Sequence, residues 1–453
     1  MNTTTCDLAI VGAGAAGLFA SIWAGLTDPS ISIIAVDGAR KIGAKILVAG
    51  GGRCNVTHAA VSETAYYGSS RNSIRNVLRQ FPVEKTVEFF ASRGVTLKAE
   101  PTGKLFPTTD DAHTILDALL AAVKTSRVRL LNPWRVTGVE HSGSDFLIAR
   151  DTAFDHVPGD PAFIRARRLI LATGGKALPR TGSDGLGYSF AKALGHTLTP
   201  QIVPALVPLT LQQNGQQSHP LVTLSGLALP CTLEVRGGTN KRLAAFTNDT
   251  LLTHFGLSGP GPLDISRSLQ AAQATDAGAA LYINFLPGYL TDDLDQMLAT
   301  GAGTSVGNFV SDLSRRKPPR EPLELAEGVT GLCDLPERLI RVLCAMANIE
   351  PSMPCHALTR DSRKALSRTL TDLKLPISGT RGFTFAEVTA GGIPLSEIQL
   401  ATMESRVRPG LHLCGEILDV DGRIGGYNFQ WAWASGFVAG KSAAMALGQQ
   451  SAT

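Results

Sequence analysis

The segment LAIVGAGAAG, residues 8–17, decides the fold expected for this chain. Asp7 to Val11 forms a short apolar run that predicts a buried strand, and the apolar stretch from Ala15 to Leu26 predicts a helix directly after it. Between them lies a GxGxxG pattern. Its first glycine permits a tight turn, its second lets the backbone approach a pyrophosphate, and its third lets helix and strand pack closely. The backbone amides at the start of the helix would bind the anion.

A second strand and an acid follow at the expected distance. The run ISIIAVD, residues 31–37, predicts a strand that completes a βαβ unit, whose parallel strands should be buried. Asp37 ends this strand twenty positions after Gly17, where an acid can hydrogen-bond ribose hydroxyls. Together these features predict a dinucleotide site. The alternative is a glycine-rich helix packed on a sheet without a ligand.

The position of the fingerprint indicates which dinucleotide is bound. It lies at the N-terminal end of the chain, and a glycine-rich segment returns late, at residues 425–426, which suits FAD. No second GxGxxG is present. The nearest segment, Thr181 to Gly187, has the wrong spacing and no strong strand before it, so NAD(P)H is expected only as a transient electron donor.

Two further glycine clusters favour a flavin. In KIGAKILVAGGGRCN, residues 41–55, three glycines without side chains would let a bulky planar ligand approach the backbone. Arg53 after them could place positive charge near a reduced flavin; a flexible surface loop is the alternative. In HLCGEILDVDGRIGGYNFQWAWASGFVAG, residues 412–440, a helix is expected to open after Gly426. Its N-terminus would stabilise the anion formed at flavin N1–C2=O on reduction, although DVDG is also typical of a solvated turn.

Two side chains, those of His254 and Cys54, are candidates for a catalytic role. His254 lies in LLTHFGLSGPGPLDISR, residues 251–267, where glycines and prolines predict a rigid ordered loop. It could donate a proton to a substrate; a structural histidine bonded to the backbone is the alternative. Cys54 follows Arg53, which predicts a lowered thiol pKa and a nucleophile or acid; a small packing residue is the alternative. The spacing indicates neither a Ser/His/Asp triad nor a metal site.

Composition sets the class of protein. The 453 residues favour two or three packed units, and 44% hydrophobic against 18% charged residues indicates a globular chain. A net charge of +4 neither demands nor excludes nucleic acid. The basic stretches 315–320 and 360–368 could contact RNA phosphates, although each is also typical of a solvated face. Seven cysteines without a CxxC pair favour a reducing cytoplasm, and the glycine pattern within the apolar residues 8–26 argues against a membrane span.

The expected architecture is α/β with a discontinuous nucleotide domain. Residues 1–199 form its first part, 200–290 an inserted β-rich domain, 291–375 a helical subdomain, and 376–453 its second part.

Five segments together resemble the BaiN/YhiN-like family of bacterial FAD-dependent flavoproteins: GAGAAG, KILVAGGGRCNVTH, LILATGG, THFGLSGP and GEILDVDGRIGGYNFQWAWASGFVAG. The resemblance spans nearly the whole chain. It implies a Rossmann-like FAD domain of the glutathione-reductase type, with an inserted β-barrel-like domain and a small helical one. It also implies reduction of carbon–carbon double bonds, either in steroid-like enones or in a uridine of large-subunit ribosomal RNA. At one point the chain departs from the family, because Lys104 in GKLFP stands where the family has the arginine of GRxFP.

The hypothesis is an FAD-dependent oxidoreductase that reduces an activated carbon–carbon double bond by hydride transfer from flavin N5. A ribosomal RNA uridine reductase that makes dihydrouridine and a non-catalytic flavin-binding redox sensor are the alternatives. The candidate catalytic residues are Cys54, His254 and Tyr427. The FAD contacts that fingerprint and resemblance imply, many through the backbone, are Gly12, Gly14, Ala15, Ala16, Gly17, Asp37, Lys45, Gly51, Gly52, Arg53, Cys54, Asn55, Val136, Thr173, Gly174, Gly415, Glu416, Gly426, Tyr427, Asn428 and Phe429.

Overall fold

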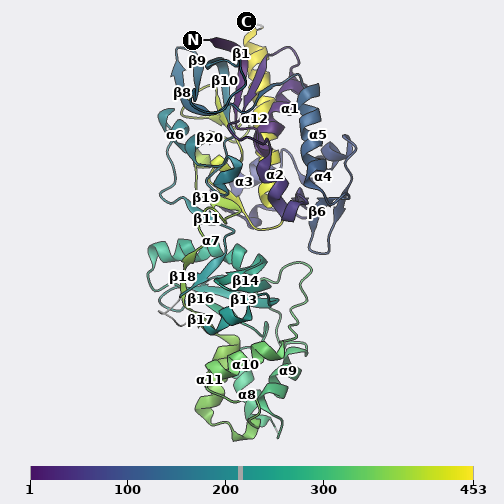
Figure 1. Ribbon diagram of the computed structural model, residues 1–453, viewed down its shortest axis with the longest axis vertical. Helices are drawn as coiled ribbons and strands as arrows, with labels where there is room; N and C mark the ends of the chain where they lie inside the picture. Colours follow the sequence, from purple (N-terminus) through teal and green to yellow (C-terminus); the bar gives the residue numbers. More distant parts are fainter. Residues whose placement is uncertain (1, 213–217, 302, 452–453) are drawn as a thin grey trace. The chain divides into compact units, whose positions relative to one another are not determined.

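The computed structural model describes residues 2–212, 218–301 and 303–451, which form two compact units (Figure 1). The first unit extends to Pro204 and resumes at Ala386, and the second is Ala205–Phe385. The chain leaves the first unit along β11 (Val203–Ala205) and returns along β19 (Val388–Ala390), and these two strands pair with each other. The four domain ranges expected from the sequence stay a prediction.

A mainly parallel sheet forms the centre of the first unit, in the order β20-β21-β22-β10-β1-β2-β7. β1 pairs in parallel with β2 and β10, β2 with β7, and β10 with β22. β8 and β9 add an antiparallel pair beside β10, and β20 and β21 another beside β22. The strands are β1 (Thr3–Val11), β2 (Ile33–Val36), β7 (Arg129–Leu131), β8 (Val136–Ser142), β9 (Asp145–Arg150), β10 (Phe163–Leu171), β20 (Ile398–Gln399), β21 (Glu404–Ser405) and β22 (Leu411–Leu413).

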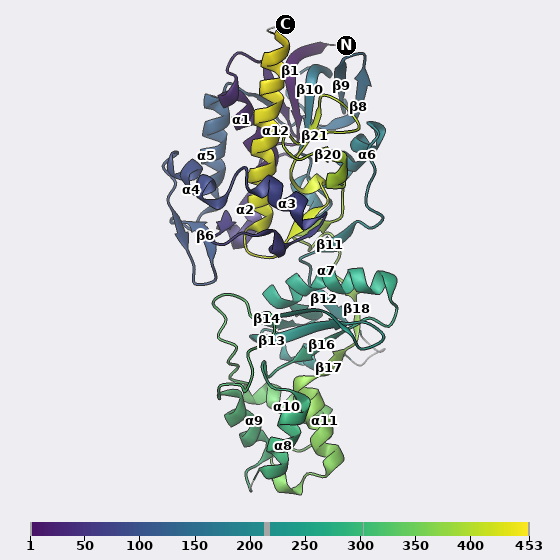
Figure 2. The same cartoon turned by 180° about the vertical axis from the view of Figure 1, so that it is seen from behind.

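Helices α1 (Ala15–Thr27) and α12 (Tyr427–Ser451) lie side by side in both views (Figure 1 and Figure 2). Small residues allow this contact. A Cβ on Gly436 would lie 2.7 Å from the carbonyl oxygen of Ala16, and one on Gly440 would lie 2.1 Å from that of Ala20. The two helices therefore run parallel. α12 begins nine residues before Gly436, whereas α1 begins one residue before Ala16. At 1.5 Å per residue, the first turn of α12 therefore lies about 12 Å beyond the start of α1.

The rest of the first unit surrounds this sheet. The remaining helices are α2 (Ala44–Val48), α3 (Arg71–Leu78), α4 (Val83–Ala91), α5 (Ala112–Thr125) and α6 (Leu186–Ala193), and the remaining strands are β3 (Thr57–His58), β4 (Tyr66–Gly68), β5 (Leu97–Ala99), β6 (Lys104–Pro107) and β23 (Val420–Gly422). Among the described residues, no helix has the length and apolar character that crossing a membrane requires.

The second unit is built on an antiparallel sheet in the order β17-β16-β13-β14-β15-β12-β18. The strands at the two ends of this order, β17 and β18, are separated in the chain by Pro376 alone, so one nearly continuous segment pairs with β16 in its first part and with β12 in its second. This arrangement agrees with the barrel-like domain that the resemblance implied. Its strands are β12 (Leu209–Leu211), β13 (Ala228–Arg236), β14 (Arg242–Thr253), β15 (Gly256–Ser258), β16 (Ala280–Asn284), β17 (Leu373–Leu375) and β18 (Ile377–Thr380), and its helices are α7 (Pro260–Thr275), α8 (Thr291–Thr300), α9 (Val306–Ser314), α10 (Glu337–Met346) and α11 (Arg360–Thr371).

The expected ordered loop after His254 is wrong. Residues 256–258 form β15, and α7 begins at Pro260 with Gly259 as its N-cap. Proline is compatible with the first turn of a helix, because the N–H that it lacks has no partner within the helix there.

Candidate cofactor site

The three glycines of the fingerprint have different surroundings. Gly12 has a φ of 98°, and a Cβ there would lie 2.4 Å from the Ala172 carbonyl oxygen, while one on Gly17 would lie 1.7 Å from that of Gly12. A Cβ on Gly14 would meet no atom within 4 Å. Gly14 is also the N-cap of α1 and has no side-chain cap. The first and third glycines are thus required by packing, whereas the second faces open space at a helix N-terminus, which fits a pyrophosphate.

Asp37 lies beside this glycine turn. Its carboxylate accepts hydrogen bonds from the backbone N–H of Ala13 at 2.6 Å and of Ala39 at 2.7 Å. Burial raises the pKa of this carboxyl above its ordinary value, and the two amides oppose that shift. A ribose hydroxyl that donates to the carboxylate would favour its charged form further. Val136, also expected to contact FAD, is buried at the start of β8.

A buried hydroxyl without a partner follows β10. Among the described residues, the Oγ1 of Thr173 has no hydrogen-bond partner, although the atom is buried. Gly174 after it has a φ of 72°, and a Cβ there would lie 2.6 Å from the Ser183 Oγ. Leaving a buried hydroxyl unpaired costs about 1–3 kcal/mol. A polar group of a bound cofactor would satisfy it, so Thr173 fits its expected role.

An ion pair joins segments that are far apart in the sequence. Lys45 on α2 donates to Glu416 at 2.8 Å, and the second carboxylate oxygen of Glu416 accepts from the Thr389 N–H at 2.9 Å. The hydroxyl of Thr389 in turn accepts from the N–H groups of Lys176 and Ala177, at 2.7 Å and 3.0 Å. The structure therefore brings the predicted Lys45 and Glu416 together. The sequence contains no local signal for Thr389, because these contacts arise only from the tertiary fold.

The GGGRCN turn has the expected open glycines but a different arrangement of side chains. Gly51 has a φ of 69°, and a Cβ there would meet nothing within 4 Å. The Arg53 guanidinium pairs with Glu100 at 2.6 Å and lies 4.0 Å from the ring centre of Phe106. Its positive charge is therefore partly neutralised by Glu100. Arginine beside a carboxylate and a ring is a stable arrangement for a half-exposed side chain.

The lowered pKa expected for Cys54 is wrong. Its side chain is fully buried, and burial raises the pKa of the thiol because a thiolate there would be desolvated. The neighbouring Arg53 does not offset this, since its guanidinium is directed to Glu100. A thiolate nucleophile at Cys54 is therefore not supported.

The start of α12 is fitted closely to the segment after this turn. Gly426 has a φ of 93°, and a Cβ there would lie 2.5 Å from the carbonyl carbon of Thr57. The Asn55 side chain accepts from the Gly426 N–H at 3.0 Å and donates to the Thr57 carbonyl at 2.9 Å. Asn428 holds the approach to the helix through both backbone groups of Gly422, at 2.8 Å and 2.9 Å. The GGGRCN turn and the GGYN segment at the start of α12 are thus joined by a hydrogen bond and by close backbone packing.

Tyr427 is held by two residues that were not expected from the sequence. Its ring stacks on His58 with centroids 4.8 Å apart and planes at 18°, and the Tyr66 hydroxyl donates to its carbonyl at 2.8 Å. His58 Nε2 bonds the Thr102 carbonyl at 3.0 Å. Phe429, the last expected contact, stacks on Trp433 at 5.5 Å. His58 lies three residues after the end of GGGRCN, and this closeness in the sequence is the one signal that could have identified it.

The remaining candidates belong to the second unit. His254 belongs to the second unit, where it is exposed in the turn between β14 and β15, and its role as proton donor stays a prediction. In the basic stretches, Arg315 pairs with Asp334 and Arg363 with Asp295, which reduces the positive charge available to RNA.

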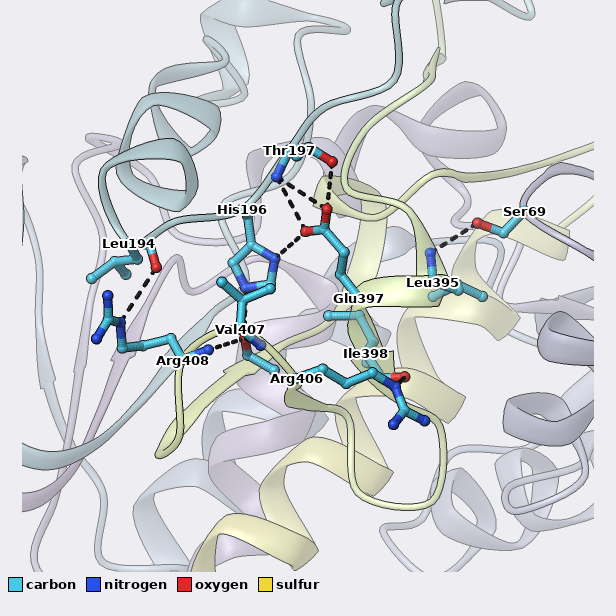
Figure 3. A network of polar contacts seen from close by, with 11 residues as sticks. Ser69, Leu194, His196, Thr197, Leu395, Glu397, Ile398, Arg406, Val407 and Arg408 are labelled. Atoms are coloured by element: carbon cyan, nitrogen blue, oxygen red, sulfur yellow. Dashed lines mark hydrogen bonds and ion pairs between the residues drawn. The ribbon is translucent and has the colours of Figure 1, made fainter.

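Ser405, His196 and Glu397 are linked in the order of a hydrolase triad. Figure 3 shows the His196 and Glu397 side chains directed toward each other. Ser405 Oγ lies 2.8 Å from His196 Nε2, and His196 Nδ1 lies 2.7 Å from Glu397. However, Ser405 and His196 are only 2% and 4% exposed. The serine oxygen also accepts from the N–H groups of Val407 and Arg408, at 3.0 Å and 2.8 Å. This network connects the residues after α6 to the β20–β21 hairpin, and a substrate cannot reach its hydroxyl.

Comparisons with known proteins agree with this geometry. The family model described as HI0933-like protein Rossmann domain matches residues 6–442. The chain is 34% identical over 437 residues to the 3-dehydro-bile acid delta(4,6)-reductase of Clostridium scindens, covering 96% of this chain and 98% of that protein. It is 32% identical over 429 residues to the ribosomal RNA dihydrouridine synthase of Escherichia coli, covering 95% and 96%.

Among solved structures, the E. coli quinol fumarate reductase FrdA has a TM-score of 0.51 at 15% identity and covers 99% of this chain and 72% of its own. At this identity the likeness concerns the fold alone. The fold, the open second glycine of the fingerprint and the unpartnered Thr173 hydroxyl all fit an FAD site. The chain belongs to the HI0933-like family and is an FAD-dependent oxidoreductase.

Proposed function

We propose that this protein reduces a carbon–carbon double bond conjugated to a carbonyl group, with NAD(P)H as the transient electron donor. The observation that carries the proposal is the parallel, offset contact of α1 and α12. It places the open Gly14 turn and the first turn of α12 about 12 Å apart along one direction. An extended dinucleotide suits such a pair of sites. The ene reduction named for the Clostridium scindens relative supports the choice of reaction.

In this proposal the chain binds and orients the cofactor through the residues described above. The Gly14 turn and Asp37 hold the pyrophosphate and ribose, Thr173 bonds a polar group, and the Lys45–Glu416 pair holds the segment before β23. The start of α12, with 25 residues in line, is a positive helix end where negative charge is favoured. FAD, when bound there, supplies the hydride from N5 that an electron-poor alkene carbon accepts.

The second hydrogen must arrive as a proton, and here the chain offers limited choices. Tyr427 is partly exposed, and its ring orientation is set by His58. His254, at an exposed turn, is the other candidate. Cys54 is not offered as a nucleophile, because its thiol stays protonated. We place the activity in the cytoplasm, since all seven cysteines are free.

A second candidate is reduction of uridine in ribosomal RNA, which the Escherichia coli relative's name supports. The chemistry is the same, because the C5=C6 bond of uracil is conjugated to a carbonyl group. A flavin-binding redox sensor that catalyses no turnover is the third hypothesis.

One set of experiments separates these functions. The purified protein is tested for bound FAD, for anaerobic flavin reduction by NADH and NADPH, and for reoxidation by a cyclic enone. A deletion strain is compared with its parent by nucleoside mass spectrometry of ribosomal RNA. Reoxidation by the enone supports the proposal, and loss of one dihydrouridine favours the RNA activity. Flavin reduction with neither result would leave the sensor, and a protein that cannot be reconstituted with FAD would contradict all three.

A further inference from the structure

A buried amide side chain at the start of α12 binds three other segments of the first unit. Gln430 lies on the first turn of this helix and is 1% exposed. Its Oε1 accepts from the hydroxyls of Thr57 at 2.8 Å and Thr86 at 2.9 Å, and its Nε2 donates to the Phe81 carbonyl at 2.8 Å. We name these four residues the Gln430 network. None of the four is among the expected FAD contacts.

The network joins α12 to parts of the chain that are far away in the sequence. Thr57 begins β3, two residues after the end of the GGGRCN turn, whereas Thr86 lies on α4 and Phe81 precedes that helix. The amide has one orientation, because its nitrogen must face the Phe81 carbonyl and its oxygen is then left for the two hydroxyls. Since hydrogen bonds are directional, these three bonds resist both sliding and rotation of the first turn of α12.

A second bond holds the same face of the helix. Trp433 lies three positions after Gln430, and residues at this spacing are neighbours on a helix surface. Its Nε1 donates to the Val56 carbonyl at 2.9 Å. Gln430 and Trp433 therefore bind α12 to two consecutive residues, Val56 and Thr57, directly after the GGGRCN turn.

A polar side chain at this buried position calls for a physical reason. An apolar side chain could fill the space without any polar atom to satisfy, and burying an amide is favourable only when its hydrogen bonds are made. A fully bonded buried network does, however, specify one arrangement of the elements that it joins. Here one of those elements is a helix start, whose first N–H groups have no partner within the helix. The direction of these groups depends on how the first turn is held.

We propose that Gln430 is a positioning residue for the cofactor. By bonding the Thr57 segment it fixes the first turn of α12, and it thereby sets how strongly the positive end of this helix favours reduced over oxidised FAD. The inference rests on the placement of FAD in the proposed function. Reduction adds negative charge at the flavin N1–C2=O group, which a helix N-terminus stabilises. Gln430 acts through the helix.

The test is the midpoint potential of FAD in the full-length, FAD-loaded protein, measured by anaerobic reduction together with a reference dye. Gln430→Met keeps the length of the side chain but removes all three bonds. We expect it to lower the preference for reduced FAD about three- to tenfold, which lowers the two-electron potential by about 14–30 mV.

Ser405→Ala is the matched control in the same unit. It removes a hydroxyl that is 2% exposed and is bonded to His196, Val407 and Arg408, none of which is an expected FAD contact. Because it shares no partner with the Gln430 network, it should change the preference for reduced FAD by less than about 1.5-fold.

Two further variants separate positioning from a general loss of stability. Thr57→Val and Thr86→Val each remove one hydroxyl bond to Gln430, but only Thr57 belongs to the segment packed against Gly426. Thr57→Val should lower the potential as Gln430→Met does, and Thr86→Val should lower it less. Should Gln430→Met fail to fold, as judged by near-ultraviolet circular dichroism, Thr57→Val carries the test, since it removes a single bond.

Unchanged potentials in Gln430→Met and Thr57→Val would overturn the inference, and so would a shift in Ser405→Ala as large as that in Gln430→Met. Reoxidation of the reduced wild-type protein by a cyclic enone is measured separately. Lowered potentials in the variants, without enone reduction by the wild type, contradict the proposed function alone. Enone reduction by the wild type, with unchanged potentials in the variants, contradicts the inference alone.

Discussion

Gly14→Ala should weaken FAD binding while leaving the FAD-free protein nearly as stable as before. Gly14 has a φ of −79° and a ψ of −165°, which alanine adopts readily, and a Cβ there would meet no protein atom within 4 Å. Alanine lowers the entropy of the unfolded chain, whereas glycine is the better N-cap residue, so these two effects oppose each other. The free energy of unfolding without FAD should change by less than about 1 kcal/mol.

The cost should appear on binding instead. The added methyl group projects into the space where the fingerprint lets the backbone approach a pyrophosphate. Loss of one hydrogen bond to a charged phosphate oxygen, about 1.5–3 kcal/mol, would raise the Kd for FAD roughly 10- to 150-fold. The assay is titration of deflavinated protein with FAD, followed by flavin fluorescence, with urea unfolding of the same samples.

Gly17→Ala is the contrasting variant. A Cβ there would lie 1.7 Å from the Gly12 carbonyl oxygen, so the backbone must move and the FAD-free protein should unfold more easily. The reasoning is refuted when Gly14→Ala binds FAD as the wild type does, or when it destabilises the FAD-free protein as much as Gly17→Ala.

Three further predictions follow from the site and its surroundings. Gly426→Ala should lower both the stability of the protein and its affinity for FAD more than Gly94→Ala does. Both glycines have a positive φ, but only a Cβ on Gly426 would lie against Thr57. Thermal unfolding and FAD titration check this prediction, and equal effects of the two substitutions would contradict it. Cys54 should resist alkylation by iodoacetamide near neutral pH in the folded protein, as read by mass spectrometry, since burial raises its pKa; rapid modification would contradict that. Burial lowers the pKa of His412 from 6.5 to about 4, so below pH 6.5 the unfolded chain binds a proton that the folded chain does not, and stability should fall. Urea unfolding at about pH 7 and about pH 5 should show a smaller loss in His412→Leu, and an unchanged loss would refute this assignment.

The parts of the fold that the sequence predicted are those with local signals. A glycine turn between a strand and a helix, with Asp37 at the end of the next strand, needs only neighbouring residues to be recognised. The start of α12 after Gly426 was predicted for the same reason. The loop expected at residues 256–261 was wrong because prolines and glycines are also compatible with a helix start, and only the register with β12 decides between the two.

The contacts and the burial of the side chains could be predicted less well from the sequence. The sequence places Arg53 beside Cys54, yet the fold turns the guanidinium to Glu100 and buries the thiol, which reverses the expected pKa shift. Thr389 bonds residues more than two hundred positions away, so no local pattern identifies it. Burial and long-range hydrogen bonds are properties of the folded chain, and both the pKa of a thiol and the partners of a hydroxyl depend on them.

The most direct test of the central claim is a single turnover of the FAD-loaded protein. The flavin is reduced anaerobically with dithionite, mixed with androst-4-ene-3,17-dione, and followed by its absorbance, while the product is identified by mass spectrometry. We predict that the flavin returns to its oxidised form and that each reduced flavin yields one product molecule with two added hydrogens. A flavin that stays reduced in a folded protein, with this enone and equally with a uridine-containing ribosomal RNA fragment, would contradict the account.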